Sequence, residues 1–254
     1  MTSSELPTEE ALGELYLYGI IRAGQELPES LVGVAATVPT VSAHGDLAVI
    51  VSGLAEGADF GTPTDLVAHS AVLDEVARAT TVLPIRFGTV VTSTEELVEQ
   101  VLEDPETLLG SLAALGGTMQ YTLRVRYEQD VLLPEILHED PGLARLQQEI
   151  GGTTEDETRD QRIALGEGIV AAFDARREAD AQELLELFEP LARDLVQHDV
   201  GAADDVLSVA ALVSRERAAP FEAAVEEAAE HRHPRMRVRL LGPQAPYDFV
   251  ERSL

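Results

Sequence analysis

The amino-acid sequence predicts an α+β fold made of two domains. Its 254 residues exceed the roughly 100–200 residues of one typical domain. Apolar strand-like runs and amphipathic helix-like stretches follow one another along the chain in an order that suits antiparallel sheets covered by helices. Gly116-Gly117 ends a helix just before the clearest strand. We therefore predict a flexible tail at 1–14, a small mixed α+β domain at 15–117 and a second domain at 118–254.

The first domain begins with strands. Residues 15–21 and 47–51 are apolar on both faces, which is typical of covered central strands. A weaker strand at 34–41 pairs with 47–51 as a hairpin, because His44-Gly45-Asp46 is suited to a turn.

Two helices with clear start signals flank the next strand. Thr62-Pro63-Thr64-Asp65 combines a capping threonine, a proline at the first helical position and an acidic residue that can bond back. In the helix that it begins, Leu66, His69, Leu73 and Val76 form one inward stripe. Ser93 to Glu96 is a second capping box, and the helix after it should bury Leu97, Val98, Val101 and Leu102. Asp104-Pro105 restarts this helix.

The strand predicted at 81–91 has three unusual residues. Pro84 cannot donate to a strand ladder, so it fits an edge, a strand start or a bulge. Arg86 places a charge in an apolar run, where a charge needs a partner. Gly88 allows the backbone to bend or to approach another group closely. We read this segment as the margin of a sheet.

The second domain is predicted as a modified ferredoxin-like sheet with helices on one face. Its strand at 119–127 alternates apolar and polar residues, and so does the last strand, 236–240. Between them we expect a strand at 205–213 and helices at 131–138, 141–150, 163–173, 184–195 and 221–228, with Pro190 kinking the fourth of these.

Composition excludes several classes of function. The chain has a net charge of −28 and no lysine, so it repels nucleic acid and anionic lipid, and neither is an expected partner. It has no cysteine, which excludes disulfides and thiol chemistry. No apolar run approaches the length of a membrane span, and the acidic start lacks the basic region of a signal peptide. We therefore expect a cytoplasmic protein without membrane contact.

No established catalytic or cofactor motif is present. The absence of lysine rules out a phosphate-binding P-loop and Schiff-base chemistry. We expect no cofactor, no metal site and no catalytic residue. His231 and His233 suit a solvated helix end better than a metal site.

Several residues have two possible roles. His69 is either a hydrogen-bonded core histidine or part of a polar cluster with Arg86. Arg86 either pairs with a buried carboxylate or presents its guanidinium to a partner. The alternating arginines either pair across strands with acidic helices or form a local basic patch; they are Arg124, Arg126, Arg235, Arg237 and Arg239.

Four segments together resemble the gas vesicle proteins of the F/L family. They are Tyr16-Leu17-Tyr18-Gly19-Ile20, Leu47-Ala48-Val49-Ile50-Val51-Ser52, Val82-Leu83-Pro84-Ile85-Arg86-Phe87-Gly88-Thr89 with His69 before it, and the closing Gly242-Pro243-Gln244-Ala245-Pro246-Tyr247-Asp248-Phe249. They occur in the family's order and extend over nearly the whole chain, from about 15 to 251. The segments match least around 153–160 and 163–199.

The resemblance implies an accessory or minor structural protein of gas vesicles, the protein-walled, gas-filled compartments that give buoyancy. It implies binding to the small hydrophobic shell protein and to other accessory proteins during assembly, in the cytoplasm and at the vesicle, without enzymatic activity. We expect the contact at the 81–91 margin and at the closing motif, with Pro84, Arg86, Phe87, Gly88, His69, Tyr247 and Phe249 as candidate residues. The alternative is a small-molecule-binding or carboxylate-using enzyme domain with a site around His69 and Arg86.

Overall fold

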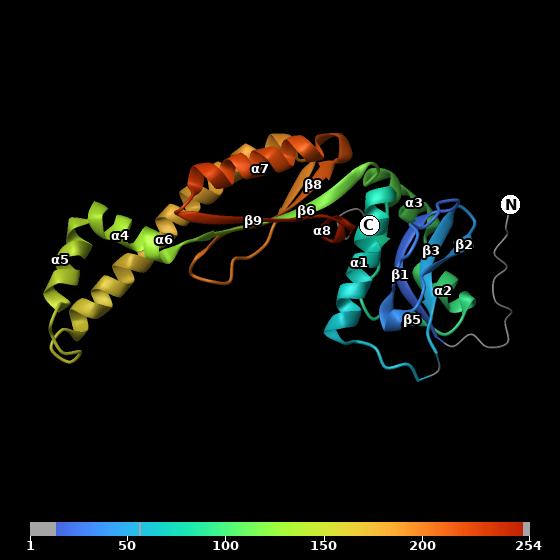
Figure 1. Cartoon of the computed structure of the whole chain (residues 1–254), viewed down its shortest axis with the longest axis horizontal. Helices are drawn as coiled ribbons and strands as arrows, with labels where there is room; N and C mark the ends of the chain where they lie inside the picture. Colours follow the sequence, from blue (N-terminus) through green and yellow to red (C-terminus); the bar gives the residue numbers. More distant parts are fainter. Residues whose placement is uncertain (1–13, 56, 251–254) are drawn as a thin grey trace. The chain divides into compact units, whose positions relative to one another are not determined.

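The computed structural model describes residues 14–55 and 57–250 and confirms the α+β class (Figure 1). Contacts divide the chain into two compact units, 1–120 with 243–254, and 121–242. The boundary lies three residues after the predicted one, and the closing segment groups with the first unit rather than the second. The predicted tail at 1–14 lies outside the described residues except for Glu14.

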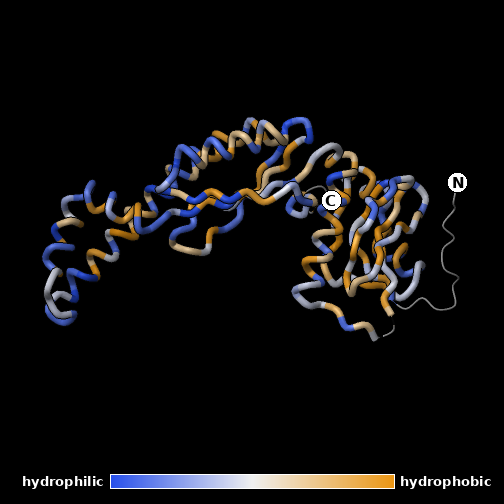
Figure 2. Tube along the Cα trace, in the orientation of Figure 1, coloured by the Kyte–Doolittle hydropathy of each residue, from blue (hydrophilic) through white to orange (hydrophobic). Residues whose placement is uncertain are grey.

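The first unit contains a sheet in the order β2-β3-β1-β4, with β5 also paired to β1. Hydrophobic residues concentrate on β1 and β3 (Figure 2), and both strands are buried except at their ends. The predicted hairpin is present, although 34–36 form a short 3-10 turn, η1, and the first strand of the hairpin starts only at Thr40. The strands are β1 (Leu15–Arg22), β2 (Thr40–His44), β3 (Leu47–Gly53), β4 (Leu83–Pro84) and β5 (Val90–Val91).

The helices of the first unit begin where the capping signals predict. In α1 (Pro63–Ala79), Thr62 and Asp65 form the reciprocal capping box. In α2 (Thr94–Val101), Ser93 accepts the Glu96 N–H, but the Glu96 carboxylate bonds Thr92 instead of Ser93. α3 (Pro105–Ala114) follows.

Two inward assignments on these helices were wrong. Leu66 is 48% exposed and Val98 is 40% exposed, whereas the neighbouring Asp65 and Leu97 are buried. The other residues predicted inward on α1, His69, Leu73 and Val76, are buried, so only the first turn of this helix departs from the prediction. Asp65 is held inward because it accepts hydrogen bonds from the backbone of Ala35 and of Thr62.

The second unit has a sheet in the order β7-β8-β6-β9, which with its crossover helices gives the β-α-β-β-α-β arrangement of a ferredoxin-like unit. The strand β7 was missed. The two helices predicted at 163–173 and 184–195 are one helix, and Pro190 lies in the 3-10 turn η2 after it instead of kinking it. The elements are β6 (Thr118–Tyr127), α4 (Gln129–Glu139), α5 (Pro141–Ile150), α6 (Arg159–Phe188), η2 (Glu189–Leu191), β7 (Asp194–Gln197), β8 (Asp205–Ser214), η3 (Arg215–Arg217), α7 (Ala218–Arg232) and β9 (Met236–Gln244).

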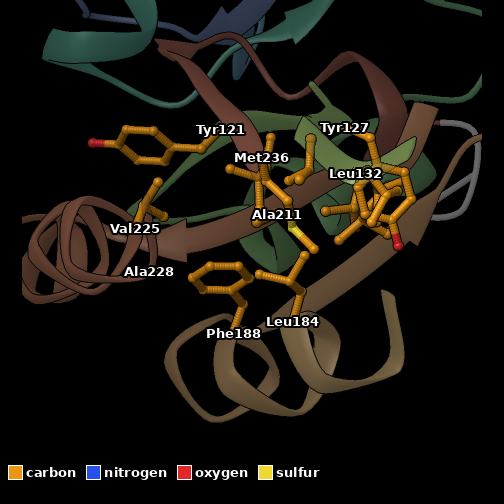
Figure 3. Close-up of a cluster of buried hydrophobic side chains, with 14 of the residues drawn as sticks. Tyr121, Tyr127, Leu132, Leu184, Phe188, Ala211, Val225, Ala228 and Met236 are labelled. Atoms are coloured by element: carbon orange, nitrogen blue, oxygen red, sulfur yellow. The ribbon is translucent and has the colours of Figure 1, made fainter. Parts of the chain in front are cut away.

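Helices α6 and α7 supply one side of the core of this unit. Leu184 and Phe188 of α6 point toward Met236 and the sheet, and Val225 of α7 lies beside them (Figure 3). The odd-numbered residues of β6 from Tyr121 to Tyr127 are all buried in the same cluster. The opposite face of β6 carries Arg124 and Arg126, both exposed, as period-two alternation requires.

Candidate functional site

The segment predicted as a strand at 81–91 is a strand interrupted by a turn. Leu83 and Val90 are seven residues apart, but their partners on β1, Ile20 and Tyr16, are only four apart. Three extra residues therefore leave the ladder between β4 and β5. Pro84 lies at the last position of β4, at the margin of the sheet where a residue without an N–H is tolerated.

The extra residues form a tight turn from Arg86 to Thr89. The Thr89 N–H donates to the Arg86 carbonyl oxygen over 3.3 Å, and the Thr89 hydroxyl donates to the same oxygen over 2.7 Å. Gly88 has a φ of 86°. A positive φ at the third position is the requirement of a type II turn, and glycine meets it without strain. We call Arg86 to Thr89 the margin turn.

The margin turn is anchored to the core by Tyr16 of β1. The Gly88 N–H donates to the Tyr16 hydroxyl over 3.1 Å, and that hydroxyl lies 2.9 Å from Nδ1 of His69 on α1. Because the hydroxyl accepts from Gly88, its own proton is available for His69. Phe87 packs edge-on against His69, with ring centroids 5.6 Å apart. The turn is thus held by one hydrogen-bonded chain and one aromatic contact.

A second tyrosine extends this buried polar network. Tyr18 stacks on His69 with ring centroids 5.5 Å apart. Its hydroxyl accepts the Val34 N–H over 2.9 Å and lies 3.1 Å from the hydroxyl of Ser52. Tyr18 also occupies the position where the register between β1 and β3 shifts by one residue, a β-bulge. We call Tyr16, Tyr18, Ser52 and His69 the tyrosine–histidine cluster.

His69 is neutral at physiological pH in this environment. Burial lowers the pKa of His69 to about 4, against the smaller opposing influence of the Ile85 carbonyl. Nε2 of the ring makes no hydrogen bond of normal geometry within residues 14–55 and 57–250. Burial likewise raises the pKa of Tyr16 to about 12. His69 and Tyr16 are therefore uncharged, and the hydroxyls of Tyr16 and Tyr18 accept the backbone N–H groups of Gly88 and Val34.

Arg86 does not share a site with His69. His69 is only 1% exposed, whereas Arg86 is exposed on the margin turn. The expected pairing with a buried carboxylate is not observed, because Arg86 makes no ion pair with any described residue. The enzyme alternative required both groups to converge on one cavity, and the structure does not bring them together.

The closing motif packs on the first unit beside the margin turn. Helix α8 (Tyr247–Val250) contacts β4, and Phe249 is 2% exposed. The Ala245 N–H donates to Asp74 of α1 over 2.9 Å, and burial raises the pKa of that carboxyl group. The Tyr247 hydroxyl bonds Ser70 of α1, and burial raises the Tyr247 pKa. Phe249 is therefore a packing residue, and Tyr247, 37% exposed, lies partly at the surface.

Five of the seven candidate residues lie at two places, three at the tyrosine–histidine cluster and two at the contact between α8 and β4. Phe87 and Gly88 contact the tyrosine–histidine cluster directly, and His69 is part of it. Pro84 and Phe249 lie where α8 meets β4. Tyr16, Tyr18 and Ser52 were not among the predicted site residues. The sequence did hold a signal for this cluster. Two tyrosines lie two residues apart on an apolar strand, and a histidine lies on the inward stripe of a helix.

The alternating arginines divide between the two predicted roles. Arg235 pairs with Asp180 of the helix α6, as cross-element pairing requires. Arg126 pairs with Asp205, the first residue of the neighbouring strand β8, and Arg237 pairs with Glu128, which directly follows β6. Arg124 and Arg239 make no ion pair in the described part of the chain.

The described residues form neither a metal-binding cluster nor a membrane-spanning helix. No group of three or more histidine, aspartate or glutamate side chains could hold a metal ion there. None of the helices in residues 14–55 and 57–250 has the length and apolarity that crossing a bilayer demands.

Comparison with known proteins identifies the family. The family described as "Gas vesicle synthesis protein GvpL/GvpF" matches residues 14–251. Gas vesicle protein F of Streptomyces sp. (strain CB03234) is 31% identical over 93% of this chain and 99% of its own length. Gas vesicle protein L of the same strain is 29% identical over 92% of each chain.

Solved structures agree on the fold. The crystal structure of GvpF from Anabaena sp. PCC7120 superposes with a TM-score of 0.79 at 24% identity, covering 94% of this chain and 98% of that one. GvpF from Microcystis aeruginosa gives a TM-score of 0.71 at 23% identity, over 93% and 98% of the two chains. The family match over residues 14–251, together with these relatives, shows that the chain belongs to the GvpL/GvpF family of gas vesicle proteins.

Proposed function

We propose that this protein is a gas vesicle accessory protein that binds the hydrophobic shell protein and other accessory proteins during vesicle assembly, in the cytoplasm and at the vesicle. It acts by holding partners and not by catalysis. Family membership supports the association with gas vesicles. The observation that carries the binding role is the margin turn, which presents a half-buried phenylalanine and an arginine without an ion pair among the described residues, on an anchored backbone.

The geometry favours the turn itself over strand addition along the margin. β4 and β5 have two residues each, and one of these four residues is a proline. So short an edge offers few unpaired N–H and C=O groups to an added strand. Helix α8 also contacts β4. Arg86 supplies a rigid fork of donors for a partner carboxylate or backbone carbonyl, and Phe87 supplies apolar area next to it.

Co-purification with the shell protein tests this proposal. Arg86→Ala and Phe87→Ala should each reduce the amount of shell protein recovered with the tagged chain, and the double variant should reduce it further. Arg145→Ala is the matched control, because Arg145 is an exposed arginine in the second unit. Circular dichroism shows whether each variant is folded. Undiminished recovery with a folded double variant would remove the margin turn from the binding surface.

A further inference from the structure

The exposed face of the second sheet carries a cluster of arginines that the proposed function does not use. Arg124 and Arg126 of β6 and Arg237 and Arg239 of β9 line one recess of about 240 Å³. The two strands are neighbours in the sheet. These are four of the 18 basic residues in a chain with 46 acidic ones, so their convergence on one recess is a marked local departure from the charge of the rest of the chain.

Neighbouring carboxylates do not saturate these guanidinium groups. Nε of Arg126 pairs with Asp205, and one terminal nitrogen of Arg237 pairs with Glu128. Their side chains remain 56% and 74% exposed. Arg124 and Arg239 are exposed and have no ion pair among the described residues. A guanidinium has five N–H donors, so most donors in the recess remain available to a ligand.

The spacing of the arginines matches an extended polypeptide. Residues two apart on one face of a strand lie roughly 6.7 Å apart, and this holds for 124/126 and for 237/239. Carboxylates at alternate positions of an extended acidic segment repeat at the same distance. Arginine pairs with carboxylates through two parallel hydrogen bonds, which fixes the orientation of each pair.

The charge of the rest of the chain selects against a nucleic acid. A nucleic acid carries its charges densely and would extend past the recess over a surface that is acidic overall. A short acidic peptide places only a few charges within the screening length of about 8 Å. We propose that this arginine recess binds an extended, carboxylate-rich segment of a partner protein, with acidic residues at alternate positions. The recess is separate from the margin turn, and this proposal does not depend on the turn's binding role.

Fluorescence anisotropy on the full chain tests the proposal. The probe is a fluorescein-labelled dodecapeptide of alternating glutamate and serine, titrated with protein at low and at physiological salt. Arg124→Gln/Arg239→Gln should weaken binding about tenfold, because it removes the two arginines without ion pairs and leaves the pairs with Asp205 and Glu128 intact. Affinity should fall as salt rises.

The matched control is Arg145→Gln/Arg159→Gln, which removes the same charge from two exposed arginines of α5 and α6. It should change affinity by less than about twofold, an effect of net charge alone. Equal weakening by both double variants would overturn the proposal, and so would no binding by the unmodified chain. Tighter, equally arginine-dependent binding of a 12-nucleotide single-stranded DNA would also overturn it in favour of a nucleic-acid site.

Discussion

The two units bury their tyrosines in different ways. In the first unit, Tyr16 and Tyr18 are 0% exposed and direct their hydroxyls inward, to His69 and Ser52 and to the backbone of Val34 and Gly88. In the second unit, Tyr121 and Tyr127 direct theirs to Glu222 and Asp180, carboxylates on helices. Glu222 is exposed, so water can take the place of the Tyr121 hydroxyl there, whereas a polar group inside the core that loses its partner stays without one. In the first unit, hydrogen bonds inside the core thus hold the margin turn in place. The core of the second unit is held chiefly by apolar packing.

This comparison predicts that the largest single loss of stability comes from truncating the apolar core of the second unit. Phe221 of α7 is 0% exposed and contacts the rings of Tyr121 and Phe188 at 5.3 and 5.9 Å. Phe221→Ala should lower the free energy of unfolding by about 3–5 kcal/mol, since it removes buried area and leaves a cavity. Chemical denaturation followed by circular dichroism measures the loss.

Hydrogen exchange shows where this loss occurs. Protection should fall in β6, β8 and α7 and remain in β1 and β3. An equal fall in β1 and β3 would mean that the two units do not unfold separately, and the comparison between their cores would lose its basis.

Acid should destabilise the first unit through His69. The pKa of His69 is lowered from an ordinary 6.5 to about 4. Between these two values the unfolded chain binds the proton and the folded chain does not, so stability falls as pH drops through this window. The histidine contributes a loss of about 3 kcal/mol from pH 7 to pH 4. The buried tyrosines of the second unit contribute none there, because their pKa values are raised.

Denaturation curves at several pH values, for the wild type and for His69→Gln, isolate this effect. The carboxylates of the chain titrate in both proteins, so the difference between the two curves reports His69. A difference that stays constant from pH 7 to pH 4 would show that the ring is not kept neutral by burial.

The hydroxyl of Tyr16, bonded inside the core, should contribute more stability than the hydroxyl of Tyr121, bonded to an exposed carboxylate. Tyr16→Phe leaves the Gly88 N–H and Nδ1 of His69 without their partner, which should cost about 1–3 kcal/mol. Tyr121→Phe frees an exposed Glu222 to bind water and should cost about 0.5–1 kcal/mol. Denaturation measures both costs. Hydrogen exchange at Gly88 should accelerate only in Tyr16→Phe; equal costs and unchanged exchange at Gly88 would contradict the anchoring role of Tyr16.

The sequence predicted the fold well where a pattern is local. Capping signals placed the start of α1, and period-two alternation placed β6 with its arginines outward. The strand β7 was missed because Leu191 and Leu195 continue the helical spacing of α6, and four residues at a sheet edge carry little strand signal. The helix α6 was split because its middle, 174–183, has no apolar residue larger than alanine, although its residues are mostly good helix formers.

The candidate site was less predictable, because its contacts are between segments distant in sequence. Pro84 and Gly88 were recognisable as special backbone positions, and the structure uses them as strand end and turn glycine. The anchoring bond joins Tyr16 to Gly88, which are 72 residues apart. No local pattern marks a tyrosine as the acceptor for a particular backbone N–H. The number of residues that leave the ladder depends on how β1 pairs with β4 and β5. That register is set by contacts between segments distant in sequence.

The smallest expected effect concerns two glycines, one from each unit. Gly88 has a φ of 86°, and a Cβ there would have no heavy atom within 4 Å. Gly88→Ala should therefore destabilise by about 1 kcal/mol from backbone strain alone. Gly166 lies within α6, also with open space around it, and Gly166→Ala should stabilise by about 0.5–1 kcal/mol. Thermal and chemical denaturation measure both. Stability changes of opposite sign in the two variants would show that position 88 needs glycine for its positive φ and not for lack of space. A stabilising Gly88→Ala would mean that the margin turn readily adopts another conformation.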